Sequence, residues 1–146
     1  MAIKKTNFLK KENRDFDNIL DSMRTHQVDV EAKTADHSVT SLEALRGTVF
    51  TNRGATAGVN FTLPSASADL SGAQFSILGL AAQPITASFS PTDSGVYKGD
   101  AAVDSIAFTL VSAIGNKMEF ICDGTSWYGL TARSGSHLDE IVTVVT

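Results

Sequence analysis

The sequence predicts an all-β fold, an antiparallel β-sandwich of the jelly-roll kind, with an extended and partly helical N-terminal arm. After residue 47, short runs in which apolar and polar residues alternate follow one another, as in strands that bury one face. Turn-forming residues end each run. All 11 glycines and 3 prolines lie in residues 47–146, whereas residues 1–46 hold 8 of the 12 basic and 8 of the 16 acidic residues. Short half-buried strands of this kind are typical of sandwiches and barrels.

These differences divide the 146 residues into three expected parts. Residues 1–46 are the arm, which contains a short amphipathic helix and is too short to bury a core alone. Residues 47–131 are the sandwich. Residues 132–146 are a C-terminal extension, in which residues 141–145 form a β-prone run with almost no charge. This terminal strand needs a partner, either within the domain or in another subunit.

Residues 12–25 have the pattern of an amphipathic helix. Phe16, Ile19, Leu20 and Met23 fall at i, i+3, i+4 and i+7, which places them on one face. A single helix of this length is only marginally stable in water, so its apolar stripe requires a surface to pack on. That surface is either the chain's own sheet or another subunit.

Residues 26–40 are polar and aperiodic, which predicts an extended linker. Its histidines and acids have no spacing typical of a metal site; they are His26, Asp29, Glu31, Asp36 and His37. Thr40 and Glu43 then form a T-x-x-E capping box, and Gly47 follows as a helix stop. One helical turn is therefore expected at the end of the arm.

The expected strands of the sandwich are residues 59–63, 74–79, 85–90, 105–112, 117–122 and 127–130. We expect the last three to form an antiparallel meander, because only short turns separate them. In the second of these turns Gly124 can adopt a positive φ, and Asp123 can accept hydrogen bonds from the following backbone. Trp127 is expected to cover the end of the core, because burial of its large ring is favourable.

The sequence contains no phosphate-binding glycine loop, nucleophile elbow, zinc-protease motif or C-x-x-C pair. The one cysteine, Cys122, lies on the buried side of an expected strand and cannot form an intrachain disulfide, which fits a reducing cytosol. Asp93, Asp100 and Asp104 fit turn and capping roles better than a calcium loop. We therefore expect no enzyme, no cofactor and no metal site.

The formal net charge of −4 gives no general attraction to nucleic acid. No run of about 18 apolar residues is present, so we expect no membrane span, and no signal peptide is recognisable. The first 14 residues differ, because five basic residues and one acidic residue give them a net charge of +4. This basic tip is either a solvated terminus or a segment that docks on an acidic protein surface.

Three motifs follow one another between residues 41 and 130. The first, at 52–64, is an N-R-G-A turn followed by a V-N-F-T-L-P strand. The second is an S-G turn at 94–95, and the third is D-G-T-S-W-Y at 123–128. The ordered set resembles structural proteins of tailed-bacteriophage virions, including head decoration proteins and tail-fibre modules. Residues 1–46 and 132–146 depart from the pattern. The resemblance implies a β-sandwich building block, often trimeric, with no catalytic residues.

Together with the arm, the resemblance leads us to expect a head decoration (cement) protein. It would be assembled in the host cytoplasm, bind the outer surface of a phage head as a homotrimer, and stabilise the lattice of the major capsid protein. The alternative is a tail-fibre or receptor-binding module. A small carbohydrate-active enzyme is disfavoured, because the sequence shows no close pair of carboxylates.

The residues expected to matter fall into two sets. The expected capsid or subunit interface comprises Lys4, Lys5, Lys10, Lys11, Phe16, Ile19, Leu20 and Met23. The expected core and turn residues are Phe61, Pro64, Phe108, Phe120, Asp123, Gly124 and Trp127.

Overall fold

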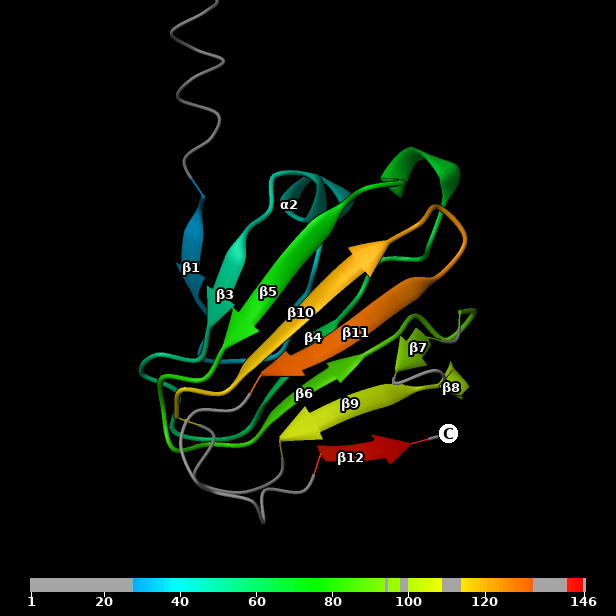
Figure 1. Cartoon of the computed structure of the whole chain (residues 1–146). Coiled ribbons are helices and arrows are strands. Elements are labelled where there is room, and N and C mark those ends of the chain that lie inside the picture. The colour runs from blue at the N-terminus through cyan, green and yellow to red at the C-terminus, as the bar shows by residue number, and fades with distance from the viewer. Residues whose placement is uncertain (1–27, 94, 98–99, 109–113, 133–141, 146) are drawn as a thin grey trace, which may run out of the picture.

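A computed structural model of the chain describes residues 28–93, 95–97, 100–108, 114–132 and 142–145. Its elements in chain order are β1 (Val30–Ala32), β2 (His37–Ser38), α2 (Ser41–Leu45), β3 (Val49–Thr51), β4 (Val59–Thr62), the 3-10 turn η1 (Ala68–Leu70), β5 (Gln74–Leu78), β6 (Ile85–Ser88), β7 (Gly95–Tyr97), β8 (Asp100–Val103), β9 (Ser105–Phe108), β10 (Lys117–Cys122), β11 (Trp127–Ala132) and β12 (Val142–Val145). The fold is predominantly β, as the sequence predicts (Figure 1).

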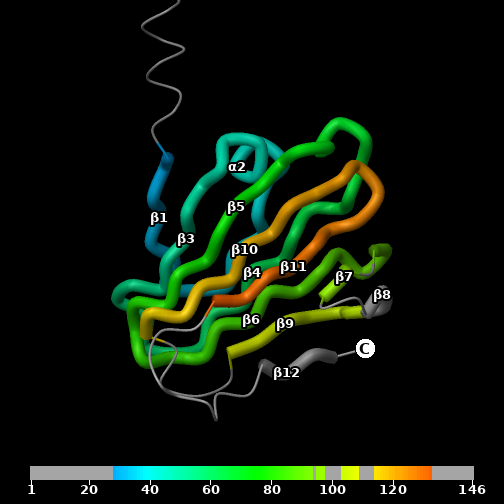
Figure 2. Tube along the Cα trace, in the orientation of Figure 1, coloured from blue at the N-terminus to red at the C-terminus, as the bar shows by residue number. Residues whose placement is uncertain are grey.

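The strands form two sheets. Sheet A has the order β1-β3-β5-β10-β11-β7-β8, and sheet B has the order β12-β9-β6-β4-β2. The first six strands alternate between the sheets, so that β1, β3 and β5 lie parallel in sheet A and β2, β4 and β6 lie parallel in sheet B. Each pass of the chain therefore adds one strand to each sheet, along the blue-to-green path in Figure 2.

Both sheets are mixed, so the expected antiparallel arrangement is wrong for half of the pairings. Of the ten strand pairings among the described residues, five are parallel. Alternation of apolar and polar residues indicates that a strand buries one face, but it is the same whichever way the neighbouring strand runs. The direction is set by the connections between strands, which the alternation does not encode.

The fold begins before the boundary expected at residue 47. Residues 30–45, assigned to the arm by their composition, supply β1, β2 and α2. Val39 and Ala44 from this segment are buried in the common core. β1 and β2 are only three and two residues long, too short to show a period of two in the sequence. The same shortness hides β3 and β7, which have three residues each.

The expected three-stranded meander is also wrong. β10 and β11 form an antiparallel hairpin in sheet A, as expected. β9, however, pairs with β6 and β12 in sheet B, and the other neighbour of β10 is β5. The chain thus crosses from one sheet to the other between Phe108 and Lys117. In both sheets every second side chain of a strand points into the shared core. The alternation therefore does not show to which of the two sheets a strand belongs.

One hydrophobic core contains side chains from both sheets. The ring of Phe50 in β3 contacts the ring of Phe61 in β4, with centroids 5.5 Å apart. Within sheet A, Phe75 stacks on Phe120 at 5.2 Å. Ring pairs of this kind contribute about 0.5–1.5 kcal/mol each beyond the burial of their surface. The contact between Phe50 and Phe61 therefore helps to hold one sheet on the other.

The C-terminal strand β12 pairs antiparallel with β9 and forms one edge of sheet B (red in Figure 1). The sequence predicts a strand at residues 141–145, with a partner either in the same domain or in another subunit. In the structure its partner is β9 of the same chain.

Gly129 in β11 allows a close approach of the two sheets. A Cβ atom placed on Gly129 collides with Cδ1 of Ile106, which projects from β9 of sheet B. The space that a side chain of β11 needs is therefore already filled from the opposite sheet.

We predict that Gly129→Ala lowers the free energy of unfolding by about 1–3 kcal/mol, because the added methyl group overpacks the core against Ile106. Urea unfolding followed by the fluorescence of Trp127 measures the change. Gly58→Ala is the control, because its added Cβ meets Pro84 at an ordinary contact distance of 3.6 Å. Equal unfolding midpoints for Gly129→Ala and the wild type would contradict the overpacking.

Candidate interaction surface

The expected interface residues and the expected core residues lie in different parts of the chain. The eight interface residues lie outside the described residues: Lys4, Lys5, Lys10, Lys11, Phe16, Ile19, Leu20 and Met23. The seven core and turn residues all lie in the described part.

Asn52, which directly follows β3, ties this strand to the connection between β5 and β6. Its side chain is fully buried. The amide oxygen accepts hydrogen bonds from the N–H groups of Leu80 and Ala81 at 2.7 and 2.8 Å. The amide nitrogen donates to the carbonyls of Ala81 and Gln83 at 3.2 and 3.4 Å. A buried polar group is costly unless it is paired, so this pairing fixes the passage of the chain from sheet A to sheet B.

The rest of the N-R-G-A motif forms the turn after Asn52. Gly54 has a φ of 81°, which favours glycine. The N–H of Ala55 donates to the carbonyl of Asn52 at 3.0 Å, and the Ala55 side chain is buried. The motif is therefore a turn that places the Asn52 side chain against the next connection.

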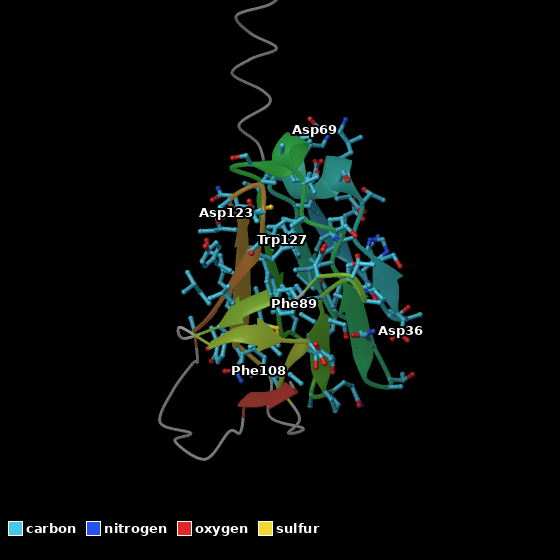
Figure 3. The ribbon with its side chains drawn as sticks, turned by 90° about the vertical axis from the view of Figure 1, so that its right-hand side faces the viewer. Asp36, Asp69, Phe89, Phe108, Asp123 and Trp127 are labelled. Carbon is cyan, nitrogen blue, oxygen red and sulfur yellow. The ribbon has the colours of Figure 1, made fainter. Side chains whose placement is uncertain are left out.

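Trp127 joins the V-N-F-T-L-P motif to the D-G-T-S-W-Y motif. Its indole N–H donates to the carbonyl of Pro64 at 2.8 Å, and its ring lies edge-on to Phe75 at 5.5 Å. The side chain is 1% exposed, and Figure 3 shows it pointing inward. Because β4 leads to Pro64 and β11 begins at Trp127, one side chain links sheet B to sheet A.

Asp123 closes the turn between β10 and β11. Its carboxylate accepts hydrogen bonds from the N–H groups of Thr125 and Ser126, both at 2.7 Å, and from the hydroxyl of Tyr128 at 2.9 Å. The backbone bonds, that from Ser126 foremost, and the hydroxyl bond hold the pKa of Asp123 below its ordinary value. The same hydrogen bond and the carboxylate charge raise the pKa of Tyr128. Gly124 has a φ of 94° in this turn.

Phe61, Phe108 and Phe120 complete the set of expected core residues, and all three are fully buried. Of the motif residues that the structure describes, Asn52, Phe61 and Trp127 lie in the core, and Gly54, Asp123 and Gly124 lie in turns. Tyr128 of the same motifs is 41% exposed on the outer side of sheet A.

A cluster of charged side chains joins β1, β2 and α2. The ammonium group of Lys33 lies 2.6 Å from a carboxylate oxygen of Glu31 and 5.7 Å from the ring centroid of Phe50. His37 Nε2 lies 3.1 Å from Oε1 of Glu43. The ammonium group of Lys33 also lies 4.0 Å from Oε1 of Glu43, so these contacts join the first two strands to α2.

Glu43 also completes the expected capping box of α2. The Thr40 hydroxyl accepts from the N–H of Glu43 at 3.2 Å, and the Glu43 carboxylate accepts from the N–H of Thr40 at 2.7 Å. Burial alone raises the pKa of Glu43. The hydrogen bonds from Thr40 and the neighbouring His37 outweigh it and leave this pKa below its ordinary value.

A polar hollow of about 420 Å³ lies beside the ends of β6 and β9. It is lined by Ser88, Phe89, Ser90, Pro91, Thr92, Asp93, Asp104 and Ser105. The Asp93 carboxylate already accepts a hydrogen bond from the N–H of Ala66 at 2.7 Å. The hollow is lined by hydroxyl and carboxylate side chains, which suit a ligand that carries hydroxyl groups.

The outer face of sheet A carries apolar side chains from β1, β3, β10 and β11, beside the charged pair Lys117 and Glu119 of β10. We call the outward side chains Val30, Val49, Ile121, Tyr128 and Leu130 the apolar face. Val30 is 68% exposed, Leu130 56%, Tyr128 41% and Ile121 37%. The alternation in residues 117–122 already places Ile121 on the outward side, so this face has a signal in the sequence.

The hydrogen bonds of Asn52, by contrast, have no signal in the sequence, because its partners are backbone groups far along the chain.

The outer face of sheet B has a different character. Its outward side chains are short and polar: Asn60, Thr62, Thr86, Ser88 and Ser105. All five are half-buried. Of the two outer faces, that of sheet A is therefore the one that offers apolar surface to a partner.

Comparison with models of protein families and with curated protein sequences found no match. In the described ranges, no group of three or more His, Cys, Asp or Glu residues could hold a metal ion. Within the same part of the chain, no helix has the length and the apolar character needed to cross a membrane.

We predict that Asn52→Ala lowers the free energy of unfolding by about 2 kcal/mol or more, because it leaves buried N–H and carbonyl groups without partners. Thermal or urea unfolding measures the loss. Arg53→Ala, at the exposed neighbouring position, is expected to change stability by less than about 0.5 kcal/mol. Similar effects of the two variants would contradict the role of Asn52.

We predict that Glu43 stabilises the fold at neutral pH and loses this effect in acid. Its pKa is lowered in the folded state, so as the pH falls below 4.5, the ordinary value, the unfolded state binds the proton first and stability decreases. Glu43→Gln keeps a capping side chain but does not titrate. The wild type should exceed this variant by about 0.5–1 kcal/mol near neutrality. The difference should vanish as the pH passes the lowered pKa, and a constant difference would contradict it.

Proposed function

We propose that this chain is a phage head decoration protein, a non-enzymatic component that binds the outer surface of the head and stabilises the lattice of the major capsid protein. In this proposal the two sheets form the compact sandwich that stands on the shell, and residues near the N-terminus make the contact. The resemblance of the three motifs to virion proteins is the starting point.

One observation carries the proposal. Two motifs meet in space, because the Trp127 indole of D-G-T-S-W-Y donates to the carbonyl of Pro64 in V-N-F-T-L-P. These two motifs thus belong to one structural unit, which supports the comparison of this unit with virion building blocks. A unit held together in this way suits a protein whose task is mechanical.

The proposed contact with the capsid is the basic tip, Lys4, Lys5, Lys10 and Lys11. In the charged group of β1, β2 and α2, the lysine side chain is already paired, because Lys33 contacts Glu31. This group therefore offers less attraction to an acidic surface than the basic tip does. A net charge of +4 in the first 14 residues suits an acidic patch on the shell. Many copies on a symmetric lattice multiply a weak contact of this kind. We propose a homotrimer as the bound form.

The second candidate is a tail-fibre or receptor-binding module. The polar hollow beside β6 and β9 favours it, because hydroxyl and carboxylate side chains can hydrogen-bond a sugar ligand. Immunogold labelling of virions separates the two proposals. Label on the tail refutes the decoration role, and label on the head refutes the fibre role.

We predict that the full chain binds expanded empty heads that lack it, and that Lys10→Glu with Lys11→Glu weakens this binding at least tenfold. Charge reversal turns an attraction to an acidic surface into a repulsion, and binding should also weaken with salt. Co-sedimentation with the heads measures the affinity, and analytical ultracentrifugation measures the oligomer.

The matched control is Arg46→Glu with Arg53→Glu, which reverses two exposed charges in the described part of the chain. This control should bind as the wild type does. No binding by the wild type contradicts the decoration role, and equal loss in both double variants contradicts the role of the tip.

A further inference from the structure

We propose that residues 12–25 pack as an amphipathic helix across the apolar face of sheet A in their own chain. The proposal concerns the isolated protein and does not depend on where it acts in a virion. It commits to one of the two packing surfaces that the sequence leaves open. The face, a hollow beside it, the reach of the chain and the chemistry of the stripe each support it.

The apolar face has two parts, one on β1 and β3 and one on β10 and β11, with the polar side chains of Ser76 and Glu119 between them. The strand register aligns Val30, Val49, Ser76, Glu119 and Leu130 in one row from β1 to β11. Four strand spacings make this row about 19 Å long. Ile121 and Tyr128 form the next pair along β10 and β11. A face with this much exposed apolar surface gains free energy when a partner covers it.

A hollow of about 160 Å³ lies on this face where the described chain begins. It is lined by Val28, Gly47, Val49, Gln74, Phe75, Ser76 and Glu119. Ser76 is the short outward side chain at the centre of the row, which leaves room above it. A space of about this size accepts one ring-sized or branched apolar group. The hollow is therefore large enough for a single side chain of the stripe.

The chain reaches this face without a long connection. Val28 borders the hollow and is 53% exposed. Met23 lies five residues before it, so the two are at most about 17 Å apart along the chain. The 14 residues of 12–25 span about 21 Å as a helix, close to the length of the row. The helix can thus lie across the strands from β1 to β11 within its own chain.

The stripe fits the face in chemistry as well as in length. Phe16, Ile19, Leu20 and Met23 carry no charge and need a surface to pack on. The charged outward residues of β10, Lys117 and Glu119, lie 3.4 Å apart and pair with each other. Burying the stripe on this face therefore does not require an unpaired charge to leave water at these two positions.

A double-mutant cycle in the full chain tests the contact. Leu20→Asp and Leu130→Asp should each lower the urea midpoint, and the double variant should lose no more than the larger single loss, because both changes remove the same contact. Leu42→Asp is the matched control, because Leu42 and Leu130 are both 56% exposed. Its effect should add to that of Leu20→Asp. Asp21→Ala, off the stripe, should leave the midpoint nearly unchanged.

Disulfide trapping provides a second readout that does not depend on stability. Leu20→Cys combined with Leu130→Cys or with Ile121→Cys should give an oxidised monomer at low protein concentration, while Leu20→Cys with Leu42→Cys should not. The native Cys122 is buried and stays in place. Mixing tagged and untagged chains before oxidation identifies any product between chains.

The outcomes separate the occupants of the face. An intrachain disulfide with a non-additive cycle supports the proposal. A disulfide between chains assigns the face to a second copy and overturns it, and an additive cycle without any disulfide overturns it as well. Neither assay contains capsids, so failure here and failure of the decoration role are distinguishable.

Discussion

The hydrogen bond from the indole of Trp127 to the carbonyl of Pro64 is the contact on which the arrangement of the two sheets depends. It joins the end of β4 in sheet B to the start of β11 in sheet A, at 2.8 Å. The ring of Trp127 also packs on Phe75, whose ring stacks on Phe120, so the bond is continuous with the aromatic core of sheet A. Since the donor is buried, losing the acceptor leaves an unpaired indole N–H in the core.

This constraint separates the residues that fix the interior from the exposed side chains of sheet A. The turn at Asp123 sets where β11 begins, and therefore where the indole can reach. On the other side of the molecule, Asn52 fixes the chain between β5 and β6 in the same manner, through buried bonds to backbone groups. With the interior held at both places, the exposed side chains of sheet A are not needed for the core. They are available for packing with another segment.

The sequence predicts most of the strands that form this interior, but it does not predict how they pair. Alternation locates β4, β5, β6, β9, β10 and β11, because each strand buries one face. It does not show that half of the pairings are parallel, since a strand's burial is independent of its neighbour's direction. The charge and glycine divide near Gly47 marks a change in composition and not the start of the fold, as the buried Val39 and Ala44 show. β1 and β2 are too short for any period to be visible, and they are placed by pairing with β3 and β4.

The parallel winding of the first six strands has a consequence for synthesis of the chain. The pairs of β1 to β6 form between strands that leave the ribosome one pass apart, so these strands can pair as they emerge. β5 is different, because its second neighbour is β10, and residues 79–116 must be made before that strand exists. Until then β5 is the open edge of a sheet that contains only β1, β3 and β5, a state in which a nascent chain is exposed to pairing with another. The order of translation thus makes the arrival of β10 and then β11 the step that joins β1, β3 and β5 to β7 and β8 in sheet A.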